Sequence, residues 1–468
     1  MERLEYLSVA EIGRRYRTGD LTPSDYVTHL IARIEALDPL LNVYIHFDAQ
    51  SARIQAERAT QELTAGADHG PLHGIPVALK DLIDVEGMAT TCASRSREAA
   101  IATADAEVVR RLRAAGAIIF GKTNTHEFAC GRPSFDLPVP PARNPWNPDH
   151  HPGGSSSGSG AGVAAGLFPL ALGTDTGGSV RHPASACGIV GFKPTYGVIS
   201  RRGVFPLAQS LDCVGILARS AEDAGLAVDA MAGIDPAEPS TVERPWKSCL
   251  ERPSQEISGL KVGYIRHFHT QDLAAPADTA ALLDMAAETI RGIGVHVEEV
   301  TLPPLSAFFA VNRILLSAEG FAVHAEHLRQ RHEDYGRLTR RALLAGAFLS
   351  AEDYVRAQKM RKRLIDAVSA LFSQYDILVS ASSMEAAARL DDPAETARTY
   401  TRQARTPFSV TGHPAISVMA GLSDTGLPIG VQFAAPAFSE PALLAFSSAF
   451  EAARGKALNP PERAGWSA

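Results

Sequence analysis

Residues 151–162 read HPGGSSSGSGAG, and nine of these twelve positions are glycine or serine. Such a composition is typical of a flexible linker, a phosphate-binding loop or a sharp turn that presents a reactive serine. The residues that follow, AGVAAGLFPLALGTD at 161–175, are almost wholly apolar, so a folded chain must bury them. Flexible linkers are flanked by polar sequence, and the stretch is therefore predicted to lie inside a fold.

Three loop types are excluded by the surrounding residues. A P-loop needs a Lys-Ser or Lys-Thr pair after its last glycine, and none follows here. A dinucleotide-binding turn and the G-x-S-x-G elbow of hydrolases both need a β-strand that leads into them. The preceding residues, NPWNPDHHP at 144–152, contain three prolines and cannot form a central strand. The match of residues 154–158 to G-x-S-x-G is therefore a chance one.

A second Gly-Gly-Ser unit suggests a different role. The unit at 153–155 occurs again at 177–179, and one helix-sized and one strand-sized segment separate the two. Such a path can bring Ser155 and Ser179 together, and the glycines before Ser179 let backbone N–H groups converge, as an oxyanion hole requires. A serine nucleophile needs a base. Lys80 suits that role because it ends the apolar strand in VALKD, where burial favours the neutral amine.

Composition narrows the class of protein. The chain has 468 residues, 45% hydrophobic and 21% charged, as in ordinary soluble globular proteins. A net charge of -7 offers no basic face for nucleic acid or for a membrane surface. Residues 1–20 are charged and amphipathic, unlike a signal peptide or a membrane anchor. The five cysteines are scattered without a CxxC pair, which indicates reduced thiols in the cytoplasm. We expect no metal and no cofactor.

The pattern of helices and strands predicts an α/β fold. Residues 8–65 have helical periodicity, with Thr22 as a cap and Pro23 in the first turn of a helix. Short apolar runs predict strands at 75–79 and 117–120. The pattern of a helix followed by a strand recurs near 259–265, around 286–302 and at 364–381, and residues 413–435 predict two strands joined by a turn. We expect layers of helices on both faces of a large, twisted, mixed β-sheet.

The same pattern predicts one α/β/α domain over residues 1–468. Residues 232–258 are the best linker candidate. However, the same kind of helix and strand pattern continues on both sides of them, which favours one domain over two. The predicted domain consists of a helical layer at 1–65, a core at 66–225, and the rest of the sheet at 226–468 with a less regular helical segment near 305–370.

Four stretches together are specific to one family: GPLHGIPVALKDLIDVEG (70–87), GAIIFGKTNTHEFA (116–129), the block from RNPWNP to SRRG (143–203) and SLDCVG (210–215). The chain resembles the amidase signature family over these stretches, and the resemblance extends to the N-terminal helices and to residues 411–436. It implies the amidase signature fold and hydrolysis of an amide without a cofactor.

The resemblance also implies roles for named residues. In this family a lysine and a serine that follows a cis peptide bond relay the proton of a second serine, which attacks the carbonyl. By motif position Lys80 is the base, Ser155 is the bridging serine after the cis Gly154–Ser155 bond, and Ser179 is the nucleophile. The oxyanion would be held by the backbone N–H groups of Thr176, Gly177, Gly178 and Ser179.

The neighbouring polar residues are interpreted as supports for this machinery. Asp175 and Arg181 flank the nucleophile and are expected to form an ion pair that fixes its loop. Ser156 is expected to join the serine-lysine network, with a plain loop serine as the alternative. Scaffold hydrogen bonds are assigned to Asn124 and Asp212. Solvated or capping roles, rather than a catalytic triad, are assigned to His126, His150, His151 and His182.

The chain departs from the family in two places where substrates bind. The first is EFACGRPSFDLPVPP at 127–141, which makes substrate-pocket candidates of Phe128, Cys130, Gly131 and Arg132. The second is SASSMEAAARL at 380–390, which lacks the prolines common in relatives and predicts a mobile or remodelled lid at 380–394. A changed pocket argues for an altered acyl or amine preference.

Three functions are compatible with these residues. The first is an amidohydrolase for small-molecule aryl or alkyl amides, whose machinery would also cleave carbamates. The second is the A subunit of glutamyl-tRNA amidotransferase, which commonly has an acidic residue shortly before a Thr-Pro pair; here that segment is the basic YTRQARTP at 400–407. The third, a non-catalytic binding protein, would have no use for a serine relay. A homodimer is the default expectation for such enzymes.

Overall fold

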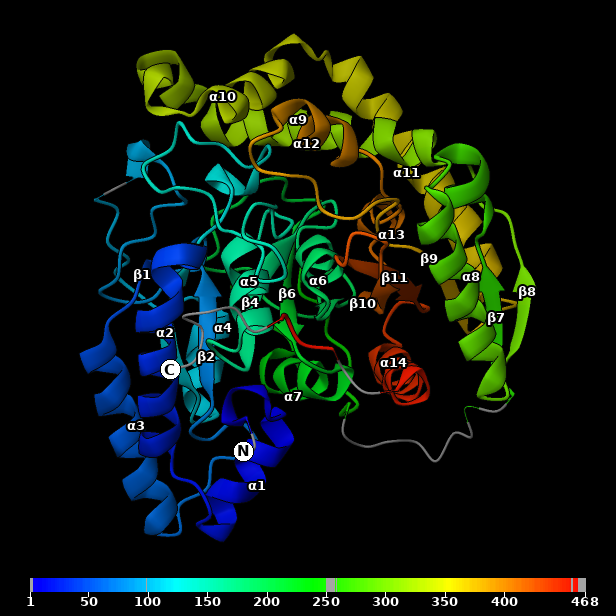
Figure 1. Cartoon of the computed structure of the whole chain (residues 1–468). Coiled ribbons are helices and arrows are strands. Elements are labelled where there is room, and N and C mark those ends of the chain that lie inside the picture. The colour runs from blue at the N-terminus through cyan, green and yellow to red at the C-terminus, as the bar shows by residue number, and fades with distance from the viewer. Residues whose placement is uncertain (1–2, 98, 250–256, 258, 456–457, 462–468) are drawn as a thin grey trace.

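One large mixed β-sheet runs through the protein. The structure is a computed structural model, described for residues 3–97, 99–249, 257, 259–455 and 458–461. Its sheet has eleven strands in the order β1-β3-β2-β4-β6-β5-β10-β11-β9-β7-β8 (Figure 1). The strands are β1 (Tyr44–His46), β2 (Pro76–Lys80), β3 (Ile118–Thr123), β4 (Leu170–Asp175), β5 (Val190–Lys193), β6 (Cys213–Ala218), β7 (Lys261–Tyr264), β8 (His296–Glu299), β9 (Ile377–Ala381), β10 (Ala415–Leu422) and β11 (Pro428–Ala434).

Antiparallel pairs run through the middle of the sheet, from β4 to β9, and parallel pairs lie on either side of them. β2 lies between β3 and β4 and is parallel to both, whereas β6 is antiparallel to β4 and β5. β10 and β11 form the antiparallel pair predicted at 413–435, and β7 pairs in parallel with β8 and β9. Strands from residue 44 to residue 434 thus share one sheet, and the predicted α/β class is confirmed.

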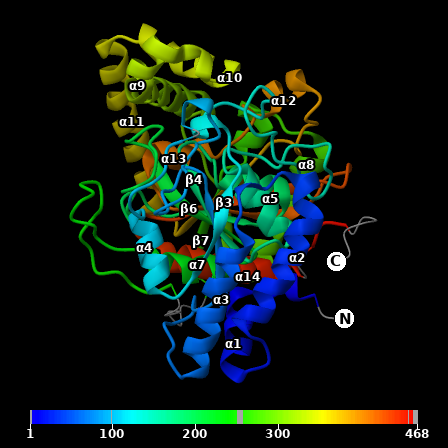
Figure 2. The same cartoon turned by 90° about the vertical axis from the view of Figure 1, so that its left-hand side faces the viewer.

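Three N-terminal helices cover the β1 end of the sheet (Figure 2). They are α1 (Val9–Thr18), α2 (Pro23–Leu41) and α3 (Ala49–Thr64). Thr22 caps α2 by accepting a hydrogen bond from the backbone N–H of Asp25, and Pro23 occupies the first turn, as predicted. The apolar stripe of α2 is buried against the core, because Tyr26, Leu30 and Ile31 have no exposed surface.

Helices lie on both faces of the sheet. α5 (Ser157–Ala165) and α6 (Arg181–Cys187) are completely buried and contact β2, β4, β10 and β11. On the opposite face in Figure 1 lie α7 (Ala221–Met231) and α14 (Glu440–Arg454), which contact β6 and β10. The remaining smaller helices are α4 (Glu107–Ala114), α8 (Ala277–Gly292), α12 (Pro393–Thr399) and α13 (Thr406–Thr411).

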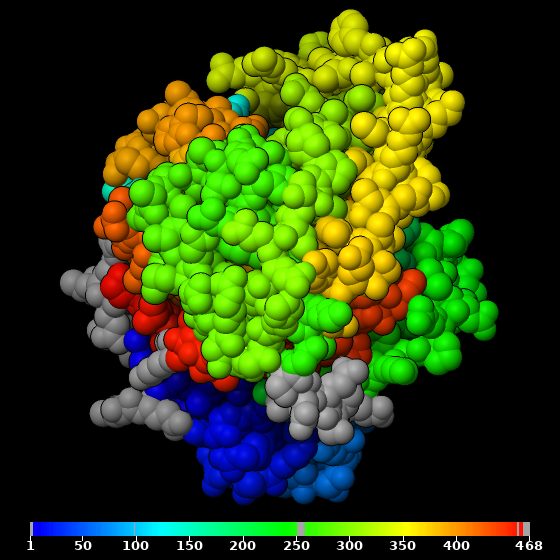
Figure 3. All heavy atoms as spheres, turned by 90° about the vertical axis from the view of Figure 1, so that its right-hand side faces the viewer, coloured from blue at the N-terminus to red at the C-terminus, as the bar shows by residue number. Residues whose placement is uncertain are grey.

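Residues 305–372 are helical, as predicted near 305–370, and two 3-10 helices, His332–Asp334 and Ala345–Phe348, separate the regular helices. α9 (Leu305–Arg331) has 27 residues, α11 (Ala351–Phe372) has 22, and the short α10 (Arg337–Leu344) joins them. This helical cap lies across the top of Figure 1, and Figure 3 shows α11 in yellow on the outer face. Among the described residues, 305–334 alone are long and apolar enough to cross a membrane, by length and composition only.

The predicted linker is attached to the fold where the structure describes it. Residues 250–256 and 258 lie outside the described residues. In the described part, the indole N–H of Trp246 donates to the Asp229 carboxylate on α7 at 2.9 Å, and the backbone N–H of Cys249 donates to the same oxygen at 2.8 Å. The division into one domain with three parts stays a prediction.

Candidate active site

The carboxyl ends of β2 and β4 bring the sequence motifs together. These strands are adjacent and parallel, so both end at the same edge of the sheet. Lys80 is the last residue of β2, and Ser179 lies in the turn between β4 and α6. Ser155 lies just before α5, which packs on both strands. The backbone N–H of Ser156 donates to the Ser179 carbonyl at 3.2 Å and so ties the two serine loops together.

Lys80 is buried among hydroxyl groups. Its side chain has no exposed surface, and its Nζ donates to Ser155 Oγ at 2.7 Å and to Thr174 Oγ1 at 2.8 Å. Burial lowers the pKa of Lys80 to about 7, although the more distant carboxylates of Asp212 and Asp175 oppose the shift. At neutral pH a large fraction of this amine is therefore unprotonated, and the Ser155 hydroxyl can then donate to its lone pair.

The loop that holds Ser155 has a fixed backbone. The Gly154–Ser155 peptide bond is cis, as the family resemblance implies. The Ser155 carbonyl accepts hydrogen bonds from the His126 backbone N–H at 3.1 Å and from Thr125 Oγ1 at 3.0 Å. A Cβ atom at Gly154 would lie 2.2 Å from the His126 ring, so only glycine fits beside this histidine. Local packing therefore fixes the direction of the Ser155 side chain.

Ser179 is partly exposed and faces a cavity of about 610 Å³ that Ser155 also lines. The structure contains no hydrogen bond between the hydroxyls of these two described residues. The hydroxyl of Ser179 is therefore accessible to a ligand, while that of Ser155 is bound to Lys80. The predicted triad thus lies around one cavity, with the lysine on the buried side.

The loop before Ser179 presents three unoccupied backbone donors. Within the described part of the chain, the N–H groups of Thr176, Gly177 and Ser179 have no acceptor, and these residues line the cavity. The structure differs from the prediction for Gly178. Its φ of 120° is a glycine conformation, and its N–H donates to Asp175 Oδ1 at 2.8 Å. Gly178 therefore shapes the loop rather than adding a free donor.

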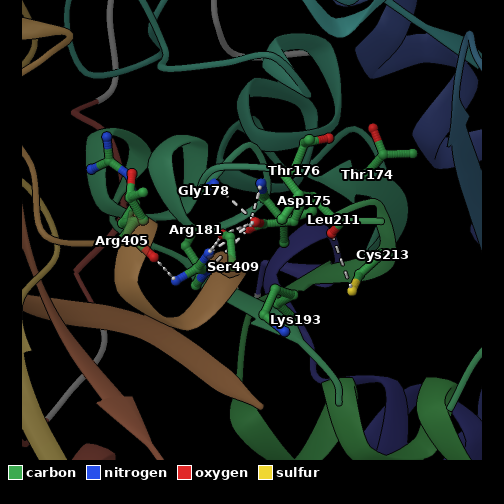
Figure 4. A network of polar contacts seen from close by, with 12 residues as sticks. Thr174, Asp175, Thr176, Gly178, Arg181, Lys193, Leu211, Cys213, Arg405 and Ser409 are labelled. Carbon is green, nitrogen blue, oxygen red and sulfur yellow. Dashed lines mark hydrogen bonds and ion pairs between the residues drawn. The ribbon is translucent and has the colours of Figure 1, made fainter. Parts of the chain in front are cut away.

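The expected ion pair between Asp175 and Arg181 is present and buried (Figure 4). Arg181 Nη2 and Nε donate to the two carboxylate oxygens at 2.8 and 3.0 Å. Burial by itself would raise the pKa of Asp175, but the Arg181 charge keeps it below its ordinary value. Arg181 also donates to Gln432, to Ser409 and to the Arg405 carbonyl, so strands and helices from the C-terminal part fix the loop.

The other supporting residues hold the loops around Lys80 and Ser179 in place. Ser156 Oγ donates to the carbonyl of Thr174 and accepts from its N–H, both at 3.3 Å, and thus reaches Lys80 only through Thr174. Asp212 accepts from Thr176 Oγ1 at 2.5 Å, and Asn124 Nδ2 donates to the Asn42 carbonyl at 2.9 Å. The scaffold roles assigned to Asp212 and Asn124 agree with these contacts.

Three of the four histidines are buried rather than solvated, which corrects that part of the prediction, whereas His151 has a capping role because its Nδ1 accepts from the Gly153 backbone N–H at 3.0 Å. The rings of His126, His151 and His182 surround Tyr400, with centroid distances of 5.9, 4.9 and 4.7 Å. Burial, with the Lys80 charge as the next cause, lowers the pKa of His126 to about 3. Burial likewise places the pKa of His182 well below its ordinary value. These rings are neutral at pH 7. The fourth, His150, is half-buried.

Three of the predicted pocket residues line the cavity and one does not. Cys130, Gly131 and Arg132 are among the lining residues. Phe128 instead packs in a separate apolar cluster, where its ring centroid lies 4.4 Å from that of His324. Residues 380–394 do not line the cavity in the described structure, whereas Tyr400, Thr401, Gln403 and Arg405 do. The mobility of 380–394 stays a prediction.

A group of possible metal ligands lies elsewhere, on α3 and the loop before β2. Glu62, His69 and His73 place one ligand atom each within 4.8 Å of one another. However, His73 Nδ1 accepts from the His69 backbone N–H, and its Nε2 lies 3.1 Å from Glu62 Oε2. Both ring nitrogens of His73 are thus already bonded within the protein, which does not favour a metal there.

The comparisons with known proteins agree with this arrangement. The family model for Amidase matches residues 25–444. The chain belongs to the amidase signature family. The central mixed sheet covered by helices is the fold of solved members of that family. The resemblance inferred from the sequence motifs is therefore confirmed.

Individual relatives match over nearly the whole chain. The A subunit of glutamyl-tRNA(Gln) amidotransferase from Synechococcus sp. (strain WH7803) is 35% identical over 98% of this chain and 99% of its own length. Peptide amidase from Stenotrophomonas maltophilia is 31% identical, with a TM-score of 0.85 and 98% of each chain covered. A protein described as part of a vestigial complex that reveals the evolutionary origins of an s-triazine catabolic enzyme is 33% identical, with a TM-score of 0.90, over 97% of this chain and all of its own.

Sequence reasoning missed two polar residues at the site. Thr174 holds the Lys80 amine, and its only signal was its position one residue before Asp175, at the end of the strand-sized segment between the two Gly-Gly-Ser units. Arg405 lines the cavity from the far end of the chain. Its only signal was the basic character of residues 400–407, since no local pattern connects that segment to Ser179.

Proposed function

We propose that the protein is an amidohydrolase that forms an acyl-enzyme on Ser179. Neutral Lys80 takes a proton from the Ser155 hydroxyl while Ser155 takes the proton of Ser179. Ser179 Oγ attacks the amide carbonyl carbon, and the relay returns the proton to the nitrogen as the C–N bond breaks. Water then attacks the ester by the same path and releases the acid.

The observation that carries this proposal is the buried Lys80 amine at 2.7 Å from Ser155 Oγ, with a pKa lowered to about 7. A lysine can act as a base near neutral pH only if burial keeps it unprotonated. The neutral histidines are not alternative bases, because among the described residues none of them hydrogen-bonds to the Ser155 or Ser179 hydroxyl. The free N–H groups of Thr176, Gly177 and Ser179 support the oxyanion, at about 3–4 kcal/mol for a well-placed donor.

The substrate in this proposal is a small-molecule amide in the cytoplasm, without nucleic acid, membrane or cofactor. A carbamate is the variant that the same attack would cleave. The similarity to A subunits of glutamyl-tRNA(Gln) amidotransferase favours a second candidate function. In that function the protein would release ammonia from glutamine as the A subunit of an amidotransferase. Glutamine carries an ammonium group, which calls for a carboxylate partner. Among the described residues that line the cavity there is no Asp or Glu, which supports the first candidate.

Two measurements test the proposal. A fluorophosphonate probe should label Ser179 in the intact protein, and peptide mapping should find no label in Ser179→Ala. A panel of amides, esters and carbamates with chromogenic leaving groups, together with glutamine, should show turnover that depends on Ser179. A label on Ser156 would restore the elbow interpretation. Turnover of glutamine alone would favour the amidotransferase function.

A further inference from the structure

The cavity beside Ser179 is lined by four arginines. Arg313 and Arg341 are exposed at the cap, Arg132 is partly exposed, and Arg405 is 3% exposed. No carboxylate among the described lining residues balances these charges. A cavity with one sign of charge and apolar walls concentrates ligands of the opposite sign. The cavity as a whole therefore favours an anion.

Arg405 is the arginine that the fold brings next to the nucleophile loop. A Cβ atom added to Gly178 would lie 2.7 Å from Arg405 Nε, so glycine at 178 is what lets the guanidinium approach. Figure 4 shows the two residues side by side, with the Arg405 guanidinium pointing away from Arg181. Because Ser179 follows Gly178, a group bound to Arg405 lies close to the reacting carbonyl.

Among the described residues, half of the Arg405 guanidinium has no hydrogen-bond partner. Nη1 donates to the Ser382 carbonyl at 2.8 Å and to Ser383 Oγ. Nε is buried without an acceptor, and no described residue accepts from Nη2. The Nε–Nη2 edge of a guanidinium is the fork that matches the two oxygens of a carboxylate.

The surroundings also leave the Arg405 charge uncompensated. Its carbonyl, rather than its side chain, contacts Arg181, and the Asp175 carboxylate is already paired with Arg181. Burial first, and then the nearby Arg181 charge, lower the pKa of Arg405 to about 9. A buried cation with unpaired N–H groups is costly unless a ligand accepts their hydrogen bonds.

We propose that Arg405 binds a carboxylate carried by the substrate, so that the preferred substrates are small amides with a carboxylate close to the scissile bond. This rests on the proposed amidohydrolase function. The carboxylate can belong to the acyl part, as in monoamides of short dicarboxylic acids, or to the amine part, as in N-acylglycines. The cavity's lack of a carboxylate distinguishes these substrates from glutamine, whose ammonium group would meet four arginines.

The first test compares matched substrates. Ammonia release from succinamate should exceed that from the neutral pentanamide by at least about 100-fold in kcat/KM for the wild type. In Arg405→Gln the ratio of the succinamate value to the pentanamide value should fall by about 100-fold. Glycine release from N-acetylglycine, in the same two proteins, assigns the carboxylate to the acyl or the amine side.

Arg402→Gln is the matched control, because Arg402 lies in the same segment, pairs with Glu385 and does not line the cavity. It should keep the preference for succinamate. A wild type without that preference would overturn the proposal. The proposal would also be overturned if Arg405→Gln has a native circular dichroism spectrum but loses activity toward both substrates equally. Arg405 would then act on the oxyanion or on the loop.

A binding measurement separates this proposal from the catalytic one. Succinate should raise the melting temperature of the wild type and of Ser179→Ala, but not that of Arg405→Gln. Binding of succinate without hydrolysis of any amide would leave the anion site standing and reject the proposed function. Amide hydrolysis with Ser179 labelled by the probe, but no succinate effect, would reject the anion site alone.

Discussion

The protonation of Lys80 should control the pH dependence of activity. Only the neutral amine can accept the Ser155 proton, and burial lowers the pKa of Lys80 to about 7. About half of the enzyme is then active at pH 7, about a tenth at pH 6 and about a hundredth at pH 5. kcat/KM should therefore rise tenfold per pH unit below the midpoint and reach a plateau in mildly alkaline solution.

The assay is kcat/KM for a neutral aryl amide between pH 5 and 9, at several temperatures. A neutral substrate is needed because Arg405 and a substrate carboxylate would add their own pH effects. The buried histidines should not contribute, since the pKa of His126 is lowered to about 3. The temperature dependence gives the heat of ionisation, which is larger for an amine than for an imidazole. An amine-like heat is expected.

Two variants decide between a lysine and a histidine. Lys80→Ala should lower amide turnover by several orders of magnitude with an unchanged circular dichroism spectrum. His182→Gln, which changes a cavity residue, should leave the midpoint in place. A midpoint near ~6.5 with an imidazole-like heat of ionisation would contradict the role of Lys80 if the pH dependence also disappears on replacing His126 or His182 but not on replacing Lys80.

Three further variants test how the fold supports the site, with urea unfolding as the measurement for each. Lys80→Met should raise the free energy of unfolding at pH 7. The lowered pKa of Lys80 destabilises the fold by about 4 kcal/mol at this pH, and the variant removes that cost, whereas losing the two hydrogen bonds to hydroxyl groups destabilises the variant by only about 1 kcal/mol each. The folded pKa lies below the unfolded value of ~10.4, so this gain should fade toward pH 10; a gain that grows with pH would contradict it. Gly154→Ala should cost about 1–3 kcal/mol and most of the activity, because the methyl group would overlap the His126 ring; unchanged stability would show that the loop can move. Arg181→Met should cost about 3–5 kcal/mol, because it leaves the Asp175 carboxylate buried and unpaired. The stability that Arg181→Met loses should be smaller at low pH, where the Asp175 carboxylate can be protonated. A loss of stability that does not depend on pH would mean that the lost packing dominates.

The positions of the candidate site residues were largely predictable because local sequence determines them. An apolar run that ends in Lys80 can only be a buried strand, and the two Gly-Gly-Ser units mark turns at strand and helix ends. The interpretation of the histidines failed for a physical reason. Burial of His126, His151 and His182 depends on Tyr400, which comes from a segment more than 200 residues away, and no local pattern reports such packing.

Pocket residues were predicted less well because the backbone direction was unknown. Phe128 has a φ of 51°, in the left-handed region, which turns its ring away from the cavity and toward His324. Cys130 and Arg132 then line the cavity instead.

The neutrality of Lys80 depends on how its acidic neighbours are bound. Asp175 and Asp212 are close enough to raise the pKa of Lys80, yet neither contacts its amine. Asp175 is held by Arg181 and by the Gly178 N–H, and Asp212 by the Thr176 hydroxyl. The contacts that shape the loop before Ser179 are therefore the same contacts that keep carboxylates away from the base. A direct carboxylate partner would stabilise the ammonium form and remove the base at neutral pH. In the proposed mechanism, the buried Asp175–Arg181 ion pair therefore helps catalysis because it keeps the Asp175 carboxylate from pairing with the Lys80 amine.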